Sequence, residues 1–332
     1  STTRPLRAFQ LRVPRSPLAA RRMLKVATVS SAAERAGARP RTRENRTGRS
    51  MEEMLPGTDP SVQGMPSLPA LFFLACATTA TAAWPAGKRS EWQGYERLDF
   101  PLPGDGAHCI VVTPKAPAEG SPWIWRARFW GHQPALDLLL LAKGFHLAYC
   151  EVGGLFGAPA AVERWDKFHA LAVKQGLSAR PVLEGMSRGG LIIVNWASAN
   201  PEKVAALYGD NPVCNFNSWP GGKNGKFSKG DWQRCLKAYG VAAEAAPQHR
   251  QPLSPETLRP LAREKVPVAL VLGLADKVVP VAENGELLAR NYQALGGPVR
   301  IWRKPGKGHH PHGLHPPDEL AAWLLKAIKA EF

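Results

Sequence analysis

The stretch 181-PVLEGMSRGG-190 decides the fold of this chain. Four residues with strand character end in Gly185, a serine follows two residues later, and a helical pattern then runs to about Ala199. An abrupt strand–serine–helix turn, the nucleophile elbow, leaves the serine hydroxyl exposed above the end of the strand. We therefore expect Ser187 to be a catalytic nucleophile.

The glycines around Ser187 have a steric role in such a turn. We expect Gly185 and Gly189 to allow close backbone approach on both sides of the serine, and Gly190 to let the helix pack on the sheet. The N–H of Arg188 would then point to where an oxyanion forms. In a chain with 31 glycines the alternative is a simple glycine-rich turn, but the position between a strand and a helix favours the elbow.

Strand and helix patterns alternate from about Tyr95 to the C-terminus. The continuous apolar run 266-VPVALVLG-273 is typical of a strand that is covered on both faces. This alternation predicts an α/β fold with a doubly wound, mostly parallel sheet, whose first two strands form an antiparallel edge. The eight expected strands are 95–100, 108–114, 122–130, 146–152, 181–185, 204–210, 266–273 and 299–305. A long segment without a regular pattern, about 211–264, follows the sixth strand.

A serine nucleophile needs a base, and the base needs an orienting acid. Asp276 follows the buried strand just quoted, and the histidine-rich segment 305-PGKGHHPHGLHPP-317 follows the last strand. The chain order Ser, Asp, His is the one expected for a nucleophile on such a turn. His309 is the first choice of base, with His310 and His312 as alternatives. A capping role for the aspartate and metal binding by the histidines are competing interpretations.

From about Tyr95 onward, the chain resembles the α/β-hydrolase superfamily. The elbow GMSRGG, the segment G-x-A-D-x-V-V-P and the terminal G-H-H-P-H match motifs of that superfamily in order and spacing. The double-glycine elbow is similar to those of secreted bacterial acetyl-xylan-esterase-like and prolyl-oligopeptidase-like serine hydrolases. The resemblance implies Ser187 as nucleophile, Asp276 as acid and His309 as base.

One departure from the superfamily concerns the oxyanion hole. The usual H-G-G-type loop is absent, and the corresponding segment reads 125-WRARFWGHQ-133. Besides the N–H of Arg188, a second oxyanion N–H is therefore expected from Arg126, Ala127 or Arg128.

The resemblance also places a lid at about 211–264, and aromatic side chains there and in the third strand are candidates for substrate binding. Aromatic platforms suit sugar rings or aryl groups. The alternative for the lid is an ordinary solvated loop. The candidate residues are Trp125, Trp130, Trp219 and Trp232.

The N-terminal residues differ in composition from the rest. The net charge of the chain is +16, yet residues 1–50 alone hold thirteen basic residues against Glu34 and Glu44. We interpret 1–64 as a basic, disordered or artefactual leader, and we expect no nucleic-acid partner.

Residues 65–82 resemble a secretory signal peptide. An apolar run, too short to span a bilayer, leads into an A-x-A cleavage pattern that ends at Ala82. This predicts a secreted or periplasmic domain at 83–332 without stable membrane insertion. Cys76 also permits a lipoprotein. In an oxidising compartment Cys214 and Cys235 could form a disulfide, and two unpaired thiols are the alternative.

The sequence thus predicts a secreted serine ester hydrolase that forms an acyl-enzyme and needs no metal or organic cofactor. Its expected substrate is a small-molecule or polysaccharide ester. A serine peptidase or amidase of the prolyl-oligopeptidase-like type is the alternative enzyme. A non-catalytic binding protein on the same fold is the alternative from another class.

Overall fold

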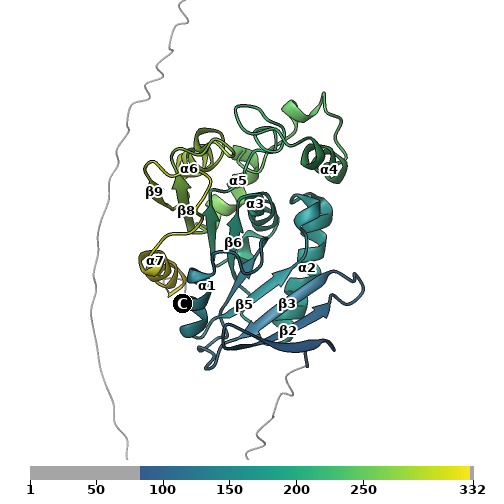
Figure 1. The fold of residues 1–332 in the computed structure, drawn as a ribbon, viewed down its shortest axis with the longest axis vertical. Coiled ribbons are helices and arrows are strands. Elements are labelled where there is room, and N and C mark those ends of the chain that lie inside the picture. Colours follow the sequence, from purple (N-terminus) through teal and green to yellow (C-terminus); the bar gives the residue numbers. More distant parts are fainter. Residues whose placement is uncertain (1–82, 330–332) are drawn as a thin grey trace, which may run out of the picture. The chain divides into compact units, whose positions relative to one another are not determined.

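The computed structural model describes residues 83–329. They form a nine-stranded sheet with helices on both faces (Figure 1). The strand order is β1-β2-β3-β5-β4-β6-β7-β8-β9, antiparallel from β1 through β3 to β5 and parallel from β5 to β9. The prediction of a doubly wound, mostly parallel sheet is confirmed. The strands are β1 (Lys88–Trp92), β2 (Tyr95–Pro101), β3 (His108–Thr113), β4 (Trp123–Arg126), β5 (His146–Cys150), β6 (Val182–Met186), β7 (Ala206–Asp210), β8 (Val268–Gly273) and β9 (Val299–Lys304).

The helices divide between the two faces of the sheet. Side chains of α1 and α7 pack against one face, and those of α2, α3, α5 and α6 against the other. In residues 83–329 no helix combines the length and the apolar character that crossing a membrane requires. The helices are α1 (Ala135–Ala142), α2 (Pro159–Lys174), α3 (Gly189–Ala199), α4 (Lys229–Tyr239), α5 (Pro255–Arg263), α6 (Gly285–Ala294) and α7 (Asp318–Lys329), and the 3-10 turns are Gly153–Leu155, Pro201–Lys203, Ala246–Gln248 and Val281–Glu283.

A hydrophobic core lies on each face of the sheet, and strand β8 contributes side chains to both. Leu270 and Leu272 belong to the core under α2, α3, α5 and α6, whereas Ala269 and Val271 belong to the core under α1 and α7. Successive side chains of a strand point to opposite faces, so a strand covered on both sides reads as an uninterrupted apolar run.

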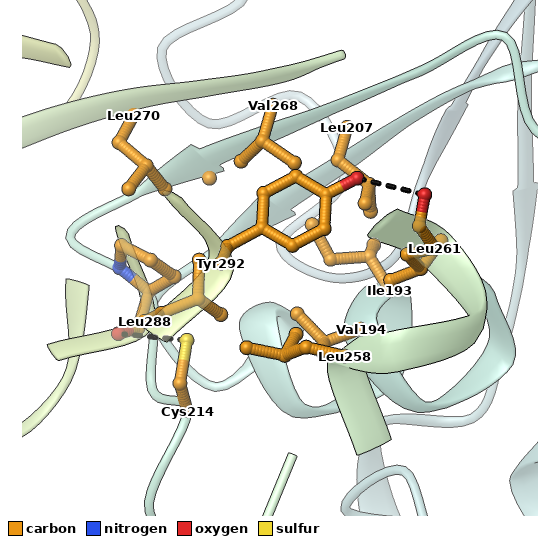
Figure 2. A pocket seen from close by; sticks show the side chains of 12 residues that line it. Ile193, Val194, Leu207, Cys214, Leu258, Leu261, Val268, Leu270, Leu288 and Tyr292 are labelled. Atoms are coloured by element: carbon orange, nitrogen blue, oxygen red, sulfur yellow. Dashed lines mark hydrogen bonds between the residues drawn. The ribbon is translucent and has the colours of Figure 1, made fainter. Parts of the chain in front are cut away.

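A small apolar gap lies in the first of these cores, between β7, β8 and the helices α3, α5 and α6 (Figure 2). Its volume is about 10 Å³, which is no more than the space of one water molecule. The hydroxyl of Tyr292 at its edge donates to the carbonyl oxygen of Leu261 at 2.9 Å. This gap is a packing defect and has no room for a ligand.

The expected strand count of eight is wrong, because β1 was not predicted. Its sequence KRSEW is polar and four of its five residues are exposed, so it carries no burial pattern. Helix α1 was also missed, since ALDLLLLA is apolar nearly throughout and shows no helical period. The expected strand at 122–130 is only Trp123–Arg126, and the segment 211–264 contains α4 and α5.

The four cysteines of the described residues are free and buried. Cys214 and Cys235 do not pair, so the disulfide interpretation is wrong. The predicted leader and signal peptide at 1–82, including Cys76, lie outside the described residues.

Candidate active site

Ser187 lies at the carboxyl end of β6, directly before α3. Its φ is 49°, a left-handed conformation that costs a residue with a side chain about 1–3 kcal/mol. Three backbone hydrogen bonds fix this conformation. Its N–H donates to the carbonyl oxygen of Asp210 at 2.9 Å, and its own carbonyl oxygen accepts from the N–H groups of Gly190 at 2.9 Å and Val213 at 2.8 Å. The serine is thus held rigidly in the geometry of the elbow.

Two glycines are required for this turn. A Cβ on Gly185 would lie 2.8 Å from the carbonyl oxygen of Gly189, and one on Gly190 would lie 2.6 Å from the carbonyl oxygen of Val213. A Cβ on Gly189 would meet nothing closer than 3.5 Å, the Cβ of Ala127. The close approach therefore occurs at Gly185 and Gly190, and the role expected for Gly189 is wrong.

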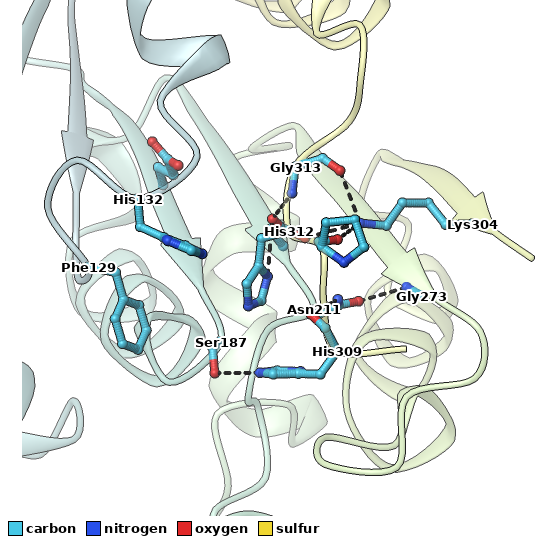
Figure 3. Close-up of polar contacts among 12 residues, drawn as sticks. Phe129, His132, Ser187, Asn211, Gly273, Lys304, His309, His312 and Gly313 are labelled. Carbon is cyan, nitrogen blue, oxygen red and sulfur yellow. Dashed lines mark hydrogen bonds and ion pairs between the residues drawn. The ribbon is translucent and has the colours of Figure 1, made fainter. Parts of the chain in front are cut away.

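The structure brings Ser187, His309 and Asp276 together. His309 Nε2 lies 3.0 Å from Ser187 Oγ (Figure 3). His309 Nδ1 lies 2.7 Å from Asp276 Oδ2. The other carboxylate oxygen, Asp276 Oδ1, accepts from the N–H groups of Val278 and Val279, both at 2.8 Å. Asp276 therefore caps its turn and also orients the imidazole. A proton on Nδ1 leaves Nε2 free to accept the hydroxyl proton of Ser187.

Two residues that the sequence did not predict hold the loop of His309. Asn211 Nδ2 donates to the carbonyl oxygen of His309 at 3.0 Å, and Asn211 Oδ1 accepts from the N–H of Gly273 at 2.7 Å. Lys304 Nζ donates to the carbonyl oxygen of Pro311 at 2.8 Å. Asn211 directly follows β7, and a polar residue just past a buried parallel strand was the signal available in the sequence.

The two alternative bases lie beside His309 in the same cleft. His312 is buried, with Nδ1 3.3 Å from Asp210 Oδ2, and its ring centroid lies 4.8 Å from that of His309. His310 is exposed, with its ring centroid 5.1 Å from that of His309. Burial and the neighbouring histidines lower the pKa of His310. His310 also lines the cleft.

The three neighbouring histidines were also candidates for binding a metal ion. One ligand nitrogen from each of His309, His310 and His312 lies within 4.8 Å of the others. Both ring nitrogens of His309 already make hydrogen bonds, to Ser187 and Asp276. A metal ion bound to His309 would replace one of these two contacts, so it would act against a serine mechanism.

The candidate oxyanion donors differ in whether their backbone N–H groups already make hydrogen bonds. The N–H of Arg188, at the start of α3, makes no hydrogen bond within residues 83–329, and a helix N-terminus favours negative charge. Arg126 lies inside β4, and the N–H of Ala127 donates to a carbonyl oxygen of β6 at 2.9 Å. The N–H of Arg128 has no partner in the same range, and it lies 3.9 Å from a Cβ built on Gly189. Arg128 is therefore the best placed of the three for the second donor.

Ser187 opens into a cleft with a volume of about 450 Å³. Aromatic rings and histidines make up most of its wall, and Phe129 and His132 are members that the sequence did not predict. The lining residues are Phe129, Trp130, His132, Met186, Ser187, Arg188, Trp219, Val278, His309, His310 and His312.

Two of the four predicted substrate-binding tryptophans, Trp130 and Trp219, line this cleft. Trp125 does not, because it is fully buried and stacks on Trp165 of α2 with ring centroids 3.8 Å apart. Trp232 packs instead against a buried cluster that includes Phe216 and Cys235 of the segment 211–264. The predictions for Trp125 and Trp232 are wrong, since both rings are used in packing.

A buried ion-pair network supports the loop that follows β4. Arg126 Nη2 lies 2.8 Å from Glu184 Oε1 and 2.9 Å from Asp137 Oδ2. Arg126 Nη1 donates to the carbonyl oxygens of Phe129 at 2.9 Å and His132 at 2.8 Å. Burial raises the pKa of Glu184, against the effect of the Arg126 charge. The guanidinium thus fixes the loop that carries Arg128 and part of the cleft.

We expect Arg126→Met to lower the free energy of unfolding by about 3–5 kcal/mol, because two buried carboxylates lose their partner. Urea unfolding followed by circular dichroism measures the change. Arg300→Met is the matched control, since that arginine and its partner Glu319 are both exposed, and it should stay within about 0.5 kcal/mol of the parent. Equal stability of the two variants would contradict the role given to Arg126.

No protein-family model and no curated protein sequence matches the chain. Solved structures do match. A puromycin-hydrolysing peptidase of Mycobacterium tuberculosis aligns with a TM-score of 0.53 at 18% identity, over 71% of this chain and 38% of that one. Est1E from Butyrivibrio proteoclasticus aligns with a TM-score of 0.50 at 18% identity, over 74% of this chain and 100% of that one. The chain has the α/β-hydrolase fold.

Dipeptidyl peptidase 4 of Porphyromonas gingivalis shares this α/β-hydrolase fold, with a TM-score of 0.53 at 14% identity over 70% of this chain and 35% of that one. The chain thus spans well under half of the length of either peptidase. In this α/β-hydrolase sheet, Ser187, Asp276 and His309 follow the carboxyl ends of β6, β8 and β9. The carboxyl ends of parallel strands are where such sheets bind ligands.

Proposed function

We propose that the protein is a serine hydrolase that cleaves carboxylic esters through an acyl-enzyme. The observation that carries this proposal is the hydrogen-bonded chain from Ser187 through His309 to Asp276, with the serine open to a cleft. A nucleophile, a base and an orienting acid in this arrangement are suited to acyl transfer.

In the first half of the reaction Ser187 Oγ attacks the ester carbonyl while His309 Nε2 takes its proton. Asp276 stabilises the imidazolium that forms. The N–H groups of Arg188 and Arg128 donate to the oxyanion of the tetrahedral intermediate. As the intermediate collapses, His309 returns the proton to the leaving alcohol.

In the second half a water molecule attacks the acyl-enzyme, and His309 accepts a proton from it. Collapse of the second intermediate releases the carboxylic acid and restores the hydroxyl of Ser187. These steps use side chains and backbone groups of the chain itself. The aromatic wall of Phe129, Trp130 and Trp219 favours an acyl or alcohol part with an apolar or planar face, such as a sugar ring or an aryl group.

A serine peptidase or amidase is the second candidate, because the same three residues can cleave amides and two of the similar structures are named as peptidases. A peptidase that binds a free N-terminal amine needs a carboxylate at the cleft. Among residues 83–329, those that line the cleft include neither Asp nor Glu. This charge pattern favours esters over peptides with a free amino terminus.

We therefore expect p-nitrophenyl esters to exceed matched p-nitroanilides by more than about tenfold in kcat/KM, beyond the ratio of their uncatalysed rates. The measurement is initial-rate kinetics on pairs with the same acyl group, including aminoacyl pairs. Comparable values for an aminoacyl anilide would favour the peptidase. Wild-type protein that turns over neither class would favour a non-catalytic binding protein. Secretion remains a prediction that depends on residues 65–82.

A further inference from the structure

The cleft carries a positively charged group beside the nucleophile. The guanidinium carbon of Arg188 lies 5.0 Å from the ring centroid of Trp219, 5.7 Å from that of Phe156 and 6.0 Å from that of Phe129. Its side chain keeps 20% of its surface exposed, and Arg188 is part of the cleft wall. Three aromatic rings thus hold a guanidinium in place at the edge of the cleft.

The charge of Arg188 is only partly compensated. Its Nη1 lies 3.2 Å from Asp231 Oδ1, the one hydrogen bond of this guanidinium in the described part of the chain. The same carboxylate accepts from Arg234 at 2.6 Å and from the hydroxyl of Ser228 at 2.9 Å. One carboxylate is therefore shared between two guanidinium groups.

The remaining donors of Arg188 are suited to an anion. A guanidinium has five N–H donors in a planar fork, and it stays protonated in proteins. Burial lowers the pKa of Arg188, and the charges of Arg128 and Arg234 act in the same direction. Such an environment favours a further negative charge beside the group.

The position of Arg188 relative to Ser187 and His309 decides whether its charge lies near the acyl part or the alcohol part of an ester. Figure 3 shows Phe129 on the far side of Ser187 from His309. His309 donates its proton to the leaving oxygen, so the alcohol part lies on the side of His309. The guanidinium carbon of Arg188 lies 6.0 Å from the ring centroid of Phe129, which places this charge on the side of the acyl part.

We propose that Arg188 binds a carboxylate on the acyl part of the substrate, so that the preferred substrate is a monoester of a dicarboxylic acid. This inference rests on the ester hydrolysis proposed above. Hydrolysis then converts the monoester and one water into a dicarboxylate, an alcohol and a proton, which is released to solvent. Charge-assisted hydrogen bonds from an arginine fork are strong, and the surrounding rings keep water from competing for them.

The test compares three p-nitrophenyl esters of one chain length: the adipate monoester, the neutral hexanoate and the cationic ε-aminohexanoate. In the wild-type protein we expect kcat/KM for the adipate monoester to exceed that for the hexanoate by about tenfold to a hundredfold, and the ε-aminohexanoate to be the slowest. Added salt should lower the value for the adipate monoester more than that for the hexanoate.

Two variants assign the effect. In Arg188→Met the ratio of adipate monoester to hexanoate should fall to near one. In Arg234→Met, which removes a guanidinium from the same Asp231 but not from the cleft wall, the ratio should stay above about tenfold. If Arg188→Met does not fold, Arg188→Lys keeps the charge without the fork, and a reduced ratio in that variant supports the proposal.

Several results would overturn the inference while the esterase function stands. One is a hexanoate that equals or exceeds the adipate monoester in the wild-type protein. Another is a ratio that survives in Arg188→Met or, where that variant does not fold, in Arg188→Lys. A third is a carboxylate preference confined to the alcohol part, seen as faster cleavage of p-carboxyphenyl acetate than of p-carbamoylphenyl acetate. Absence of turnover on every ester would instead remove the proposed function itself.

Discussion

Ser187→Ala is expected to lower kcat on a p-nitrophenyl ester by about 10³-fold or more. The change removes only the Oγ atom, which lies 3.0 Å from His309 Nε2. Alanine at a φ of 49° is no more strained than serine, and the three backbone hydrogen bonds of residue 187 do not involve the hydroxyl. Loss of activity with an unchanged unfolding midpoint is therefore the result that the geometry predicts.

Ser198→Ala is the matched control for this variant. Ser198 lies in α3, the same helix that Ser187 precedes, and it is not part of the cleft wall. We expect its kcat to stay within about twofold of the wild-type value. The serine mechanism is wrong if Ser187→Ala keeps turnover close to that of the control. Since an esterase and a peptidase would both lose activity, this pair of variants tests the nucleophile and leaves the substrate class to the ester and anilide measurements.

The position of the elbow could be predicted because its chemistry and its backbone demands coincide in one short stretch. Gly185 and Gly190 stand where a side chain would collide with backbone atoms, and Ser187 stands between them. Asp276 could be located because it follows β8, whose residues are all buried, and His309 because it lies in the histidine-rich segment after the last strand. Parallel strands bring their carboxyl ends to one edge of the sheet, which places the three residues together.

Contacts between segments distant in the sequence could not be predicted in the same way. The loop after β4 is set by Arg126, whose guanidinium bonds two carbonyl oxygens of that loop from a buried position. Nothing local marks this arginine as buried, so the second oxyanion donor stayed open among three residues. Trp125 was predicted to bind substrate for a related reason. The sequence pattern of a strand does not distinguish an aromatic residue that faces a core from one that faces a cleft.

The edge of the sheet illustrates the same limit. Strand β1 pairs with β2 along its whole length, yet its side chains are largely exposed. A strand held by backbone hydrogen bonds alone leaves no periodic pattern of apolar residues. Lys304 and Asn211 were missed because they donate to backbone carbonyl groups of the loop that carries His309. Every residue has such a carbonyl group, so the sequence does not show which ones are bound.

The three neighbouring histidines should differ sharply in their importance. His309 contacts both Ser187 and Asp276. His312 is buried next to Asp210, whose Oδ2 accepts a hydrogen bond from the N–H of Gly313. His310 is exposed at the cleft wall and makes no hydrogen bond to a side chain within residues 83–329. From these contacts we expect His309 to act in catalysis, His312 to support the loop and His310 to make at most a substrate contact.

We expect His309→Ala to reduce kcat about as much as Ser187→Ala, because members of a triad act as one unit. His310→Ala should cost less than about tenfold, since it removes no contact to Ser187 or Asp276. His312→Ala should lower the thermal unfolding midpoint, because it leaves the carboxylate of Asp210 buried beside an empty space, and its effect on kcat should be small. Kinetics and thermal unfolding of the three variants, measured side by side, separate these effects. If His309→Ala is active and His310→Ala or His312→Ala is inactive, the general base is the histidine whose loss abolishes activity. Activity in all three variants would place the base elsewhere and remove the main support for a serine hydrolase.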